Sequence, residues 1–468
     1  MKGIRTNSID ESVRLLQYNE FILGKYKEAC KENLFLRKRV AELERKVRIY
    51  ENENTPSSML SPYTKPVMKS PNRLPVGTNP RGKPLGGNGA TRKIPKKIDK
   101  TVEVNFIQEE LKKLKEKYGD KLEIKKINHY VWNIPAIQIF VTLFIIEKIY
   151  LGRKLIAEAT HPELPKRGIF GNELRSWIIS LKNQFAGSCE KVAEHIKDLT
   201  GESFSQQAIK DCVHRTGEEL KPEYRKLGEE LRESEVVGGD TSSWRVNGLN
   251  YVLWLFCAVN IVFIQINKSK SREIILKILS CDFEGVFKSD CAPEYQKFAK
   301  YFQKCFGHLL RTTYTLALEN PKKDIVLLHR WLTNLFNEMN EFLKEDPPPD
   351  KREKMYNYFD GKLEDIIYHN WKSKWAISIV KNRLIKFREH WCTAILFPGV
   401  SLTNNDTESH IRTAIPTRKM LGGHRTEEGA EYYAITQSLI LTWRLRGLSA
   451  YHEMIRKFEE LNSEFVYN

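Results

Sequence analysis

Residues 235–267 read EVVGGDTSSWRV, NGLNYVLWLFCAV and NIVFIQIN, three apolar runs separated by short polar breaks. Runs of this length that are rich in Val, Ile, Phe and Trp are typical of consecutive strands. Next along the chain, SREIILKILS at 271–280 predicts a helix and GVFKSD at 285–290 predicts a fourth strand. APEYQKFAKYF at 292–302 predicts another helix. The pattern therefore indicates an α+β unit.

Two of these predicted strands carry an acid near their end. Asp240 follows the apolar VV and GG of the first strand, and Asp290 closes the fourth. Three strands, a helix, a strand and a helix is the order of RNase-H-like folds, in which the fourth strand lies beside the first. We therefore expect the two carboxylates to share a metal ion. Asp282 and Glu284 are rival acids, but they precede the apolar part of the fourth strand, where a carboxylate faces away from the sheet's carboxyl end.

A third candidate acid follows a helical region predicted at about 315–395, which KEDPPPDKRE interrupts. Glu408 stands in NNDTESHIR, where Asn404, Asn405 or Asp406 is expected to cap the helix that presents it. Asp406 lies on another face of that helix, so we expect it to cap rather than to bind metal. The chain has 59 acidic residues, so this pattern alone leaves open whether the three acids act together.

The chemistry of such a group of acids is specific. Cutting a phosphodiester requires a deprotonated nucleophile and a neutralised leaving oxygen, and two Mg²⁺ ions about 4 Å apart provide both. Hard cations of this kind prefer oxygen ligands on rigid elements, such as the ends of strands. Three carboxylates brought together would therefore suit a nuclease.

The charge of the chain favours an anionic partner. Its 468 residues include 76 Lys and Arg against 59 Asp and Glu, a formal net charge of +17. This excess favours nucleic acid, although an anionic membrane surface would also attract it. The strongest apolar run, at 136–146, is shorter than the roughly 18 residues that suggest a membrane span. Eight cysteines without paired spacing are expected to be reduced thiols, so we expect a soluble cytoplasmic protein.

The first 51 residues predict a coiled-coil dimerisation helix. Apolar residues repeat every seven positions, with Val40 at an a position, Leu36 and Leu43 at d positions, and Asn33 at an a position. This combination favours a parallel dimer with Asn33 setting the register. A lone amphipathic helix is the alternative.

The next two segments change character. Residues 52–100 have no sustained apolar period and are strongly basic towards their end, which predicts a disordered linker that can also lie along DNA phosphates. Residues 101–168 begin with a predicted helix and continue with a strand-like stretch at 127–150. We expect this second segment to be a small mixed unit.

The helical period returns in residues 169–233. One predicted helix is opened by Ser188 and closed by Gly201, and another is opened by Ser205. Two short helices around a tight turn suggest a helix-turn-helix that contacts DNA, and a plain helical bundle fits the pattern equally well. Residues 234–468 then form the predicted α+β core with its helical insertion.

Several of these stretches together resemble the transposases of the insertion-sequence sixty-six family. They are DTSSWRVNGLNYVLWLF, SREIILKIL, EGVFKSD, KCFGHLLR, LTNNDTESHIR and RKMLGGHRTEEGAEYYAITQSLI. The family's pattern reads DETGWRV, SD with a following tyrosine, CWAHLLR and DNNAAERALR. Placed residue by residue, the resemblance assigns metal-binding and catalytic roles to Asp240, Asp290 and Glu408.

The resemblance implies a DDE transposase, which binds transposon ends, nicks DNA by Mg²⁺- or Mn²⁺-dependent hydrolysis with two ions, and transfers the 3′-hydroxyl to target DNA. The implied partners are DNA, as terminal inverted repeats and target, and further copies in a homodimer or higher oligomer, with no membrane. Such proteins are prokaryotic, cytoplasmic and nucleoid-associated. Whether accessory transposition proteins are needed stays open.

The sequence departs from the family's pattern beside the acids. Thr241, Ser242 and Ser243 replace Glu-Thr-Gly after the first Asp, and Ser409 replaces the Arg after the Glu. These changes leave the metal ligands intact but would weaken contacts with DNA ends. A catalytically silent DNA-binding protein derived from a transposase is therefore the alternative function, and a coiled-coil structural adaptor is a third.

Basic residues near the third acid also match the family. The resemblance implies that Arg412, Arg418, Lys419 and Arg425 contact DNA phosphates, with a solvated basic face as the alternative.

Zinc ligands are missing where family members carry two C-x-x-C-G knuckles. The four cysteine positions are occupied by Lys115, Tyr118, Lys148 and Leu151, so no tetrahedral site can form there and no zinc is expected. Cys305 and His308 have a C-x-x-H spacing without a second pair, for which packing is the favoured interpretation.

Overall fold

The computed structural model describes residues 97–105, 107–118, 128–129, 131–132, 134–320 and 323–463. The chain divides into two units, Met1–Arg81 and Gly82–Asn468, and the described residues belong to the second. The predicted coiled coil at 1–51, with Asn33, Leu36, Val40 and Leu43, and nearly all of the predicted linker lie outside the described residues.

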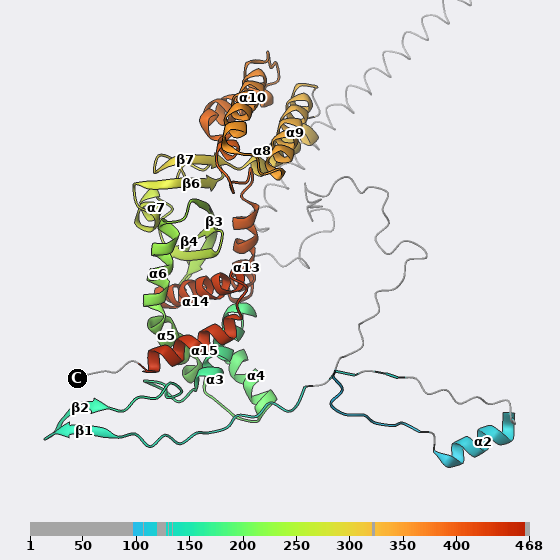
Figure 1. Cartoon of the computed structure of the whole chain (residues 1–468), viewed down its shortest axis with the longest axis vertical. Helices are drawn as coiled ribbons and strands as arrows, with labels where there is room; N and C mark the ends of the chain where they lie inside the picture. The colour runs from blue at the N-terminus through green and yellow to red at the C-terminus, as the bar shows by residue number, and fades with distance from the viewer. Residues whose placement is uncertain are drawn as a thin grey trace, which may run out of the picture. The chain divides into compact units, whose positions relative to one another are not determined.

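A five-stranded mixed sheet organises the second unit (Figure 1). The strands are β3 (Val236–Val246), β4 (Leu249–Ala258), β5 (Ile261–Asn267), β6 (Phe283–Ser289) and β7 (Ala299–Lys304). Their order across the sheet is β5-β4-β3-β6-β7. The first three form antiparallel pairs, whereas β6 lies parallel to both β3 and β7. The predicted placement of the fourth strand beside the first is therefore confirmed.

A two-residue turn sets the register between β3 and β4. Asn247 and Gly248 have φ angles of 50° and 75°, and these two residue types tolerate the left-handed region best. The turn pairs Val246 with Leu249, and the antiparallel pairing continues from there to Gly238 and Cys257. A short dipeptide in the sequence thus aligns the strand that carries Asp240 with its neighbour.

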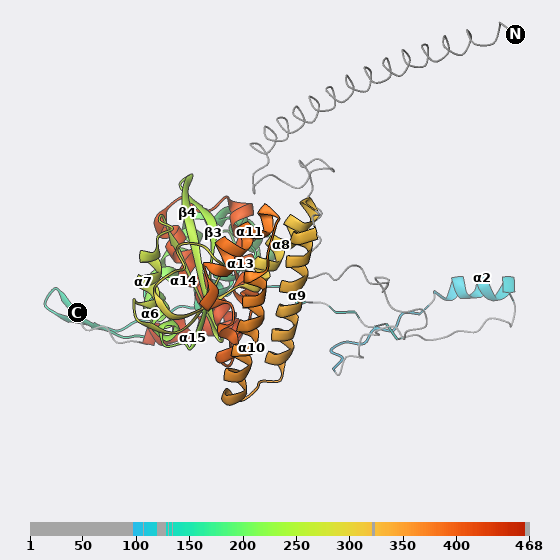
Figure 2. The same cartoon turned by 90° about the horizontal axis from the view of Figure 1, so that it is seen from above.

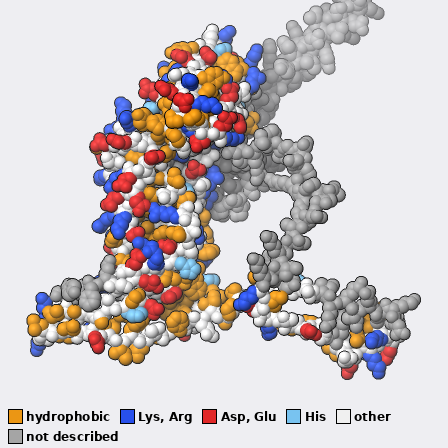
Figure 3. Space-filling view, viewed as in Figure 1, with side chains coloured by type: hydrophobic (Ala, Val, Ile, Leu, Met, Phe, Trp, Pro, Cys, Tyr) orange, Lys and Arg blue, Asp and Glu red, His pale blue; other side chains and the backbone are white. Residues whose placement is uncertain are grey.

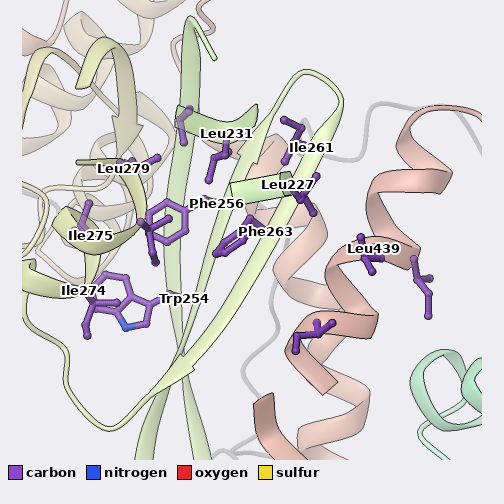
Figure 4. Packing of buried hydrophobic residues seen from close by; sticks show 14 of the residues in the cluster. Leu227, Leu231, Trp254, Phe256, Ile261, Phe263, Ile274, Ile275, Leu279 and Leu439 are labelled. Atoms are coloured by element: carbon purple, nitrogen blue, oxygen red, sulfur yellow. The ribbon is translucent and has the colours of Figure 1, made fainter. Parts of the chain in front are cut away.

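The sheet is buried on both faces, which explains the almost continuous apolar run of β4. Trp254 and Phe256 pack into one cluster with side chains of β5, α6 (Lys221–Arg232) and α7 (Arg272–Leu279) (Figure 4). Leu253 and Leu255 point to the opposite face, where they meet side chains from α13 (Asn405–Leu421) and α14 (Glu427–Leu445).

The segment at 292–302 is not the helix that its sequence predicts. Its last residues form β7, which pairs in parallel with β6. Tyr295, Phe298 and Phe302 have nearly helical spacing, but they reach Phe287 of β6 from a loop and a strand, with ring centroids 5.6, 4.7 and 6.4 Å from it. The shared contact with one buried ring, rather than a helical face, accounts for the apolar period.

The helices before the sheet are α3 (Asn172–Gln184), α4 (Cys189–Thr200), α5 (Gln206–Glu219) and α6. Among them, α4 has both predicted ends and α5 has its predicted start. Ser188 and Ser205 cap α4 and α5 by accepting from the amides three residues later, and Gly201 ends α4 with a φ of 80°. Gly217 of α5 lies directly on Tyr432 of α14 and α15 (Ala450–Ser463) contacts α3, so these helices pack onto the core.

Less regular structure precedes these helices. It contains α2 (Gln108–Tyr118) and an antiparallel hairpin of β1 (Lys148–Leu151) and β2 (Lys154–Glu158). Within the described residues of the predicted strand-like stretch at 127–150, strand begins only at Lys148. The described chain before it exposes large apolar side chains such as Phe140 and Ile145, and hydrophobic side chains gather on the surface around the β1–β2 hairpin (Figure 3). None of the helices in the described ranges is long and apolar enough to cross a membrane.

The helical insertion forms a second apolar cluster. Its helices are α8 (Phe306–Glu319), α9 (Lys323–Lys344), α10 (Pro349–Tyr368), α11 (Lys374–Ile379) and α12 (Thr393–Leu396), with short turns of helix at Val380–Ile385 and Arg388–His390. Figures 1 and 2 show α9 and α10 side by side, and the predicted interruption is the proline-rich connection between them. Val286 of β6 and Phe306 of α8 belong to the same cluster, so the insertion packs against the sheet.

Candidate functional site

Three acids on separate elements lie within the range of one another's charges. Asp240 lies in β3, Asp290 directly follows β6, and Glu408 stands in the first turn of α13. The parallel pairing of β3 and β6 sets Gly238 opposite Lys288. Continuing that register by two residues brings Asp240 level with Asp290.

Close contacts hold α13 against β3 and so position Glu408. The side-chain amide of Asn404 donates to the carbonyl oxygen of Gly239 at 2.9 Å, and Thr407 donates to the Asn404 side-chain oxygen at 2.8 Å. A Cβ atom on Gly238 would lie 2.2 Å from the Thr407 hydroxyl oxygen. Only a glycine at this position therefore permits the observed approach of helix and strand.

Asp406 does not cap this helix, contrary to the sequence prediction. Asn404 occupies the cap position, and its side chain binds β3 rather than the amides of α13. Asp406 lies in the first turn with an exposed side chain, 3.5 Å from the Lys288 ammonium. The Asn404 side chain binds β3 rather than the amides of α13 because this bond satisfies a buried polar group of each element.

The charges of Asp290 and Glu408 act on Asp240. The pKa of Asp240 is raised from 3.8 to about 6, chiefly by burial and in part by the negative charges of Asp290 and Glu408. The Thr241 amide, which donates to the Asp240 carboxylate at 2.7 Å, opposes this rise. A cation held among the three carboxylates would relieve their repulsion. The site therefore suits a positively charged ligand.

A buried lysine fixes the loop that carries Asp290. The Lys304 ammonium donates to the Ser289 hydroxyl at 3.0 Å, to the Asp290 carbonyl oxygen at 2.9 Å and to the Tyr295 carbonyl oxygen at 3.1 Å. Burial lowers the pKa of Lys304 to about 8. Lys304 was not predicted from the sequence, because the segment before it was predicted as a helix rather than as β7.

Glu408 has basic neighbours on two sides. One carboxylate oxygen, Oε2, lies 3.6 Å from the guanidinium of Arg311 and 3.9 Å from that of Arg412. The other, Oε1, lies 3.5 Å from Nδ1 of His308. Arg311 was not predicted from the sequence either, although it ends the KCFGHLLR stretch that carries part of the family resemblance.

The other predicted basic residues have different surroundings. Lys419 and Arg425 are exposed, as is the side chain of Arg412, so all three can reach a partner. Arg418 is 9% exposed, and its guanidinium donates to the hydroxyls of Ser242 and Ser243, both at 2.8 Å. These bonds favour a role in positioning β3.

The replaced residues beside the acids thus have structural partners. The Ser242 and Ser243 hydroxyls accept hydrogen bonds from the buried guanidinium of Arg418. The Ser409 hydroxyl donates to the Asp406 carbonyl oxygen at 2.7 Å within its own helix. The rival acids Asp282 and Glu284 are exposed at the start of β6, the opposite end from Asp290.

Comparison with known proteins identifies a relationship over most of this region. A comparison with curated proteins gives no match. A family model described as Transposase IS66 family matches residues 167–432, more than half of the 468 residues. The matched range begins just before α3 and includes all three acids.

Proposed function

Because the chain belongs to the IS66 family of transposases, we propose that it cuts and joins DNA at transposon ends, with Asp240, Asp290 and Glu408 as its metal-binding acids. The observation that supports this proposal is the pairing of β3 with β6, which sets Asp240 level with Asp290, together with Glu408 lying close enough for its charge to raise the pKa of Asp240. The strand order, with a parallel β3 and β6 at the centre, supports an RNase-H-like core.

The three side chains fit a hard divalent cation. All offer oxygen ligands, and Oε1 of Glu408 is buried with no hydrogen-bond partner among the described residues. Two Mg²⁺ or Mn²⁺ ions held by these carboxylates would, when bound, activate the attacking oxygen and neutralise the leaving oxygen of a phosphodiester. The protein's part is to hold the carboxylates rigidly, which the strand pairing, Lys304 and Asn404 provide.

Positive potential beside the acids suits a DNA phosphate. The α8 and α13 helices begin side by side, because the Phe306 amide donates to the Leu402 carbonyl oxygen at 2.9 Å. Helix N-termini favour anions, and the Arg311 and Arg412 guanidinium groups add positive charge at the same place. Exposed Lys419 and Arg425 would extend the contact along the DNA backbone.

Further parts of the proposal concern assembly. Joining two transposon ends requires two active chains together, and the heptad pattern at 1–51 would supply a homodimer or a higher oligomer. The α3–α5 helices would contribute a DNA contact of helix-turn-helix type.

Single replacement of each acid by alanine tests the proposal. In Mg²⁺, nicking and strand transfer on DNA that carries the element's ends should fall at least about a thousandfold for Asp240→Ala, Asp290→Ala and Glu408→Ala. Binding to the same DNA should be nearly unchanged, because affinity rests on Lys and Arg spread over a wide surface.

Two other acids serve as matched controls. Asp282→Ala and Asp406→Ala remove exposed carboxylates and should leave cleavage close to that of the parent chain. A Glu408→Ala chain that still nicks DNA, free of contaminating nuclease, would remove Glu408 from the site. A parent chain that binds the ends but never cuts them would instead favour the silent DNA-binding alternative.

A further inference from the structure

A second group of potential metal ligands meets at Glu408. Cys305 immediately precedes α8 and His308 lies in its first turn, so the two side chains share one side of that helix. Glu408 approaches from the first turn of α13. The cysteine sulfur, a histidine ring nitrogen and a glutamate oxygen all lie within 4.8 Å of one another.

The atoms that face each other in this group have no hydrogen bonds. Nδ1 of His308 and Oε1 of Glu408 are 3.5 Å apart and buried, and neither has a hydrogen-bond partner within the described part of the chain. Buried polar atoms are rarely left in this state. Arg311 and Arg412 lie near the other carboxylate oxygen, Oε2, which leaves Oε1 directed at the histidine. Both atoms therefore lack a partner that a bound ion beside them would supply.

The third atom completes a recognisable ligand set. Cys305 is 2% exposed, and its sulfur accepts from the Asn404 amide at 3.2 Å, which keeps it beside the other two. Thiolate, imidazole and carboxylate together suit Zn²⁺ and similar transition metal ions, whereas Mg²⁺ prefers oxygen alone. Ligand bonds of about 2.0 to 2.3 Å in tetrahedral geometry put such atoms about 3.5 Å apart, so the group needs to contract by only about 1 Å.

Access and charge are also compatible with a bound ion. His308 has a side chain 36% exposed and Glu408 one 13% exposed, which gives a path from solvent. On binding, the Cys305 thiol would release its proton to solvent, so thiolate and carboxylate together would balance a divalent charge. Three protein ligands leave one coordination position for water.

We propose that Cys305, His308 and Glu408 form a binding site for a transition metal ion of the Zn²⁺ class, which shares Glu408 with the Mg²⁺ site. It is separate from the knuckle positions, where the ligands are missing. Zn²⁺ in this site would withdraw Glu408 from the catalytic ions and so inhibit cleavage. This consequence rests on the proposed function, whereas the binding itself does not.

Co²⁺ is the probe, added to the full chain in excess Mg²⁺. A thiolate ligand gives cobalt a near-ultraviolet charge-transfer band, and tetrahedral coordination strengthens its visible absorption. We expect both in the parent chain and in Cys281→Ser, which removes an exposed thiol elsewhere. Cys305→Ser should lose the charge-transfer band, and His308→Ala, a change at a partly exposed residue, should lower the Co²⁺ affinity by about tenfold or more. Circular dichroism of each variant checks that it is folded.

Two results would overturn the site. One is a parent chain without a thiolate band, and the other is a band that persists unchanged in Cys305→Ser and His308→Ala. Neither result depends on DNA cleavage, so the metal site can be tested even in a chain that cuts no DNA. In an active chain, Zn²⁺ inhibition measured relative to each variant's own activity in Mg²⁺ should weaken in His308→Ala, and equal inhibition of parent and variant would contradict the shared use of Glu408.

Discussion

The strand side and the helix side of the site are built differently. Asp240 and Asp290 are placed by the backbone pairing of neighbouring strands, which fixes their register over several residues. Glu408 is placed by a few side-chain contacts of Asn404 and Thr407 with β3. The strand side thus rests on a backbone ladder, whereas the first turn of α13 rests on side-chain contacts; further along, α13 also packs on β4 and binds β3 through Arg418. The position of Glu408 should therefore be the easier one to disturb.

Gly238→Ala should disturb the helix side most. The added methyl group would meet the Thr407 hydroxyl and the Asn404 side chain at 2.2 and 2.6 Å, so α13 must shift away from β3. A displacement of about 1 Å at a catalytic group can cost about a hundredfold in rate, and we expect a loss of cleavage at least that large. Overpacking should also reduce the free energy of unfolding by about 1–3 kcal/mol.

Gly361→Ala is the matched control for this change. Gly361 lies within α10, and nothing stands within 4 Å of the added methyl group. Denaturant unfolding should show this variant slightly more stable, since alanine favours helix by about 0.5–1 kcal/mol. Normal cleavage by Gly238→Ala would show that α13 does not depend on the close contact.

On the strand side, Asp240→Asn should change stability with pH. Because the pKa of Asp240 is raised from 3.8 to about 6, its contribution to stability is present below pH 3.8 and is lost as pH rises through about 6. The neutral asparagine avoids this loss. In the presence of a chelator of divalent ions, the free energy of unfolding at neutral pH should be higher in the variant than in the parent by up to about 3 kcal/mol. Solvent screening of the partly exposed carboxylate reduces this difference.

Thermal unfolding measured across this pH range checks the sign. The advantage of Asp240→Asn should shrink as pH falls below about 6, where the parent carboxyl becomes protonated. Asp282→Asn, at an exposed position, should follow the parent chain. An advantage that is the same at every pH would show that the charge of Asp240 is not its cause.

Asn404→Ala should disturb the position of α13 less than Gly238→Ala does. It removes the bond to the Gly239 carbonyl oxygen and leaves the Thr407 hydroxyl without its acceptor, which should cost about 1–3 kcal/mol in the free energy of unfolding. Cleavage should fall less than in Gly238→Ala, because nothing forces the helix outward. Asn382→Ala, which removes an exposed amide bonded only to nearby Ser378 within the described residues, serves as the control in the same unfolding experiment.

Predictions from the sequence succeeded where a short segment determines its own structure. The capping serines of α4 and α5 and the apolar runs of β3 to β5 specify local elements without help from distant residues. They failed where a distant contact decides. Tyr295 and Phe298 have helical spacing because both contact the buried Phe287 ring, not because they lie on a helix. Asn404 stands at the cap position of α13, but its side chain binds the Gly239 carbonyl oxygen of β3.

The sequence alone determined that Asp240 lies in a strand and that Asp290 closes one, because the apolar runs that form β3 and β6 are local. Strand β3 continues to Val246, so Asp240 lies within it rather than near its end as predicted. It also determined that Glu408 opens a helix. Only the tertiary structure decided that Glu408 approaches Asp240, and that Cys305 and His308 turn towards the same carboxylate. The physical reason is that these approaches depend on Gly238, Asn404 and the packing of α8 beside α13, contacts between residues that no local pattern connects.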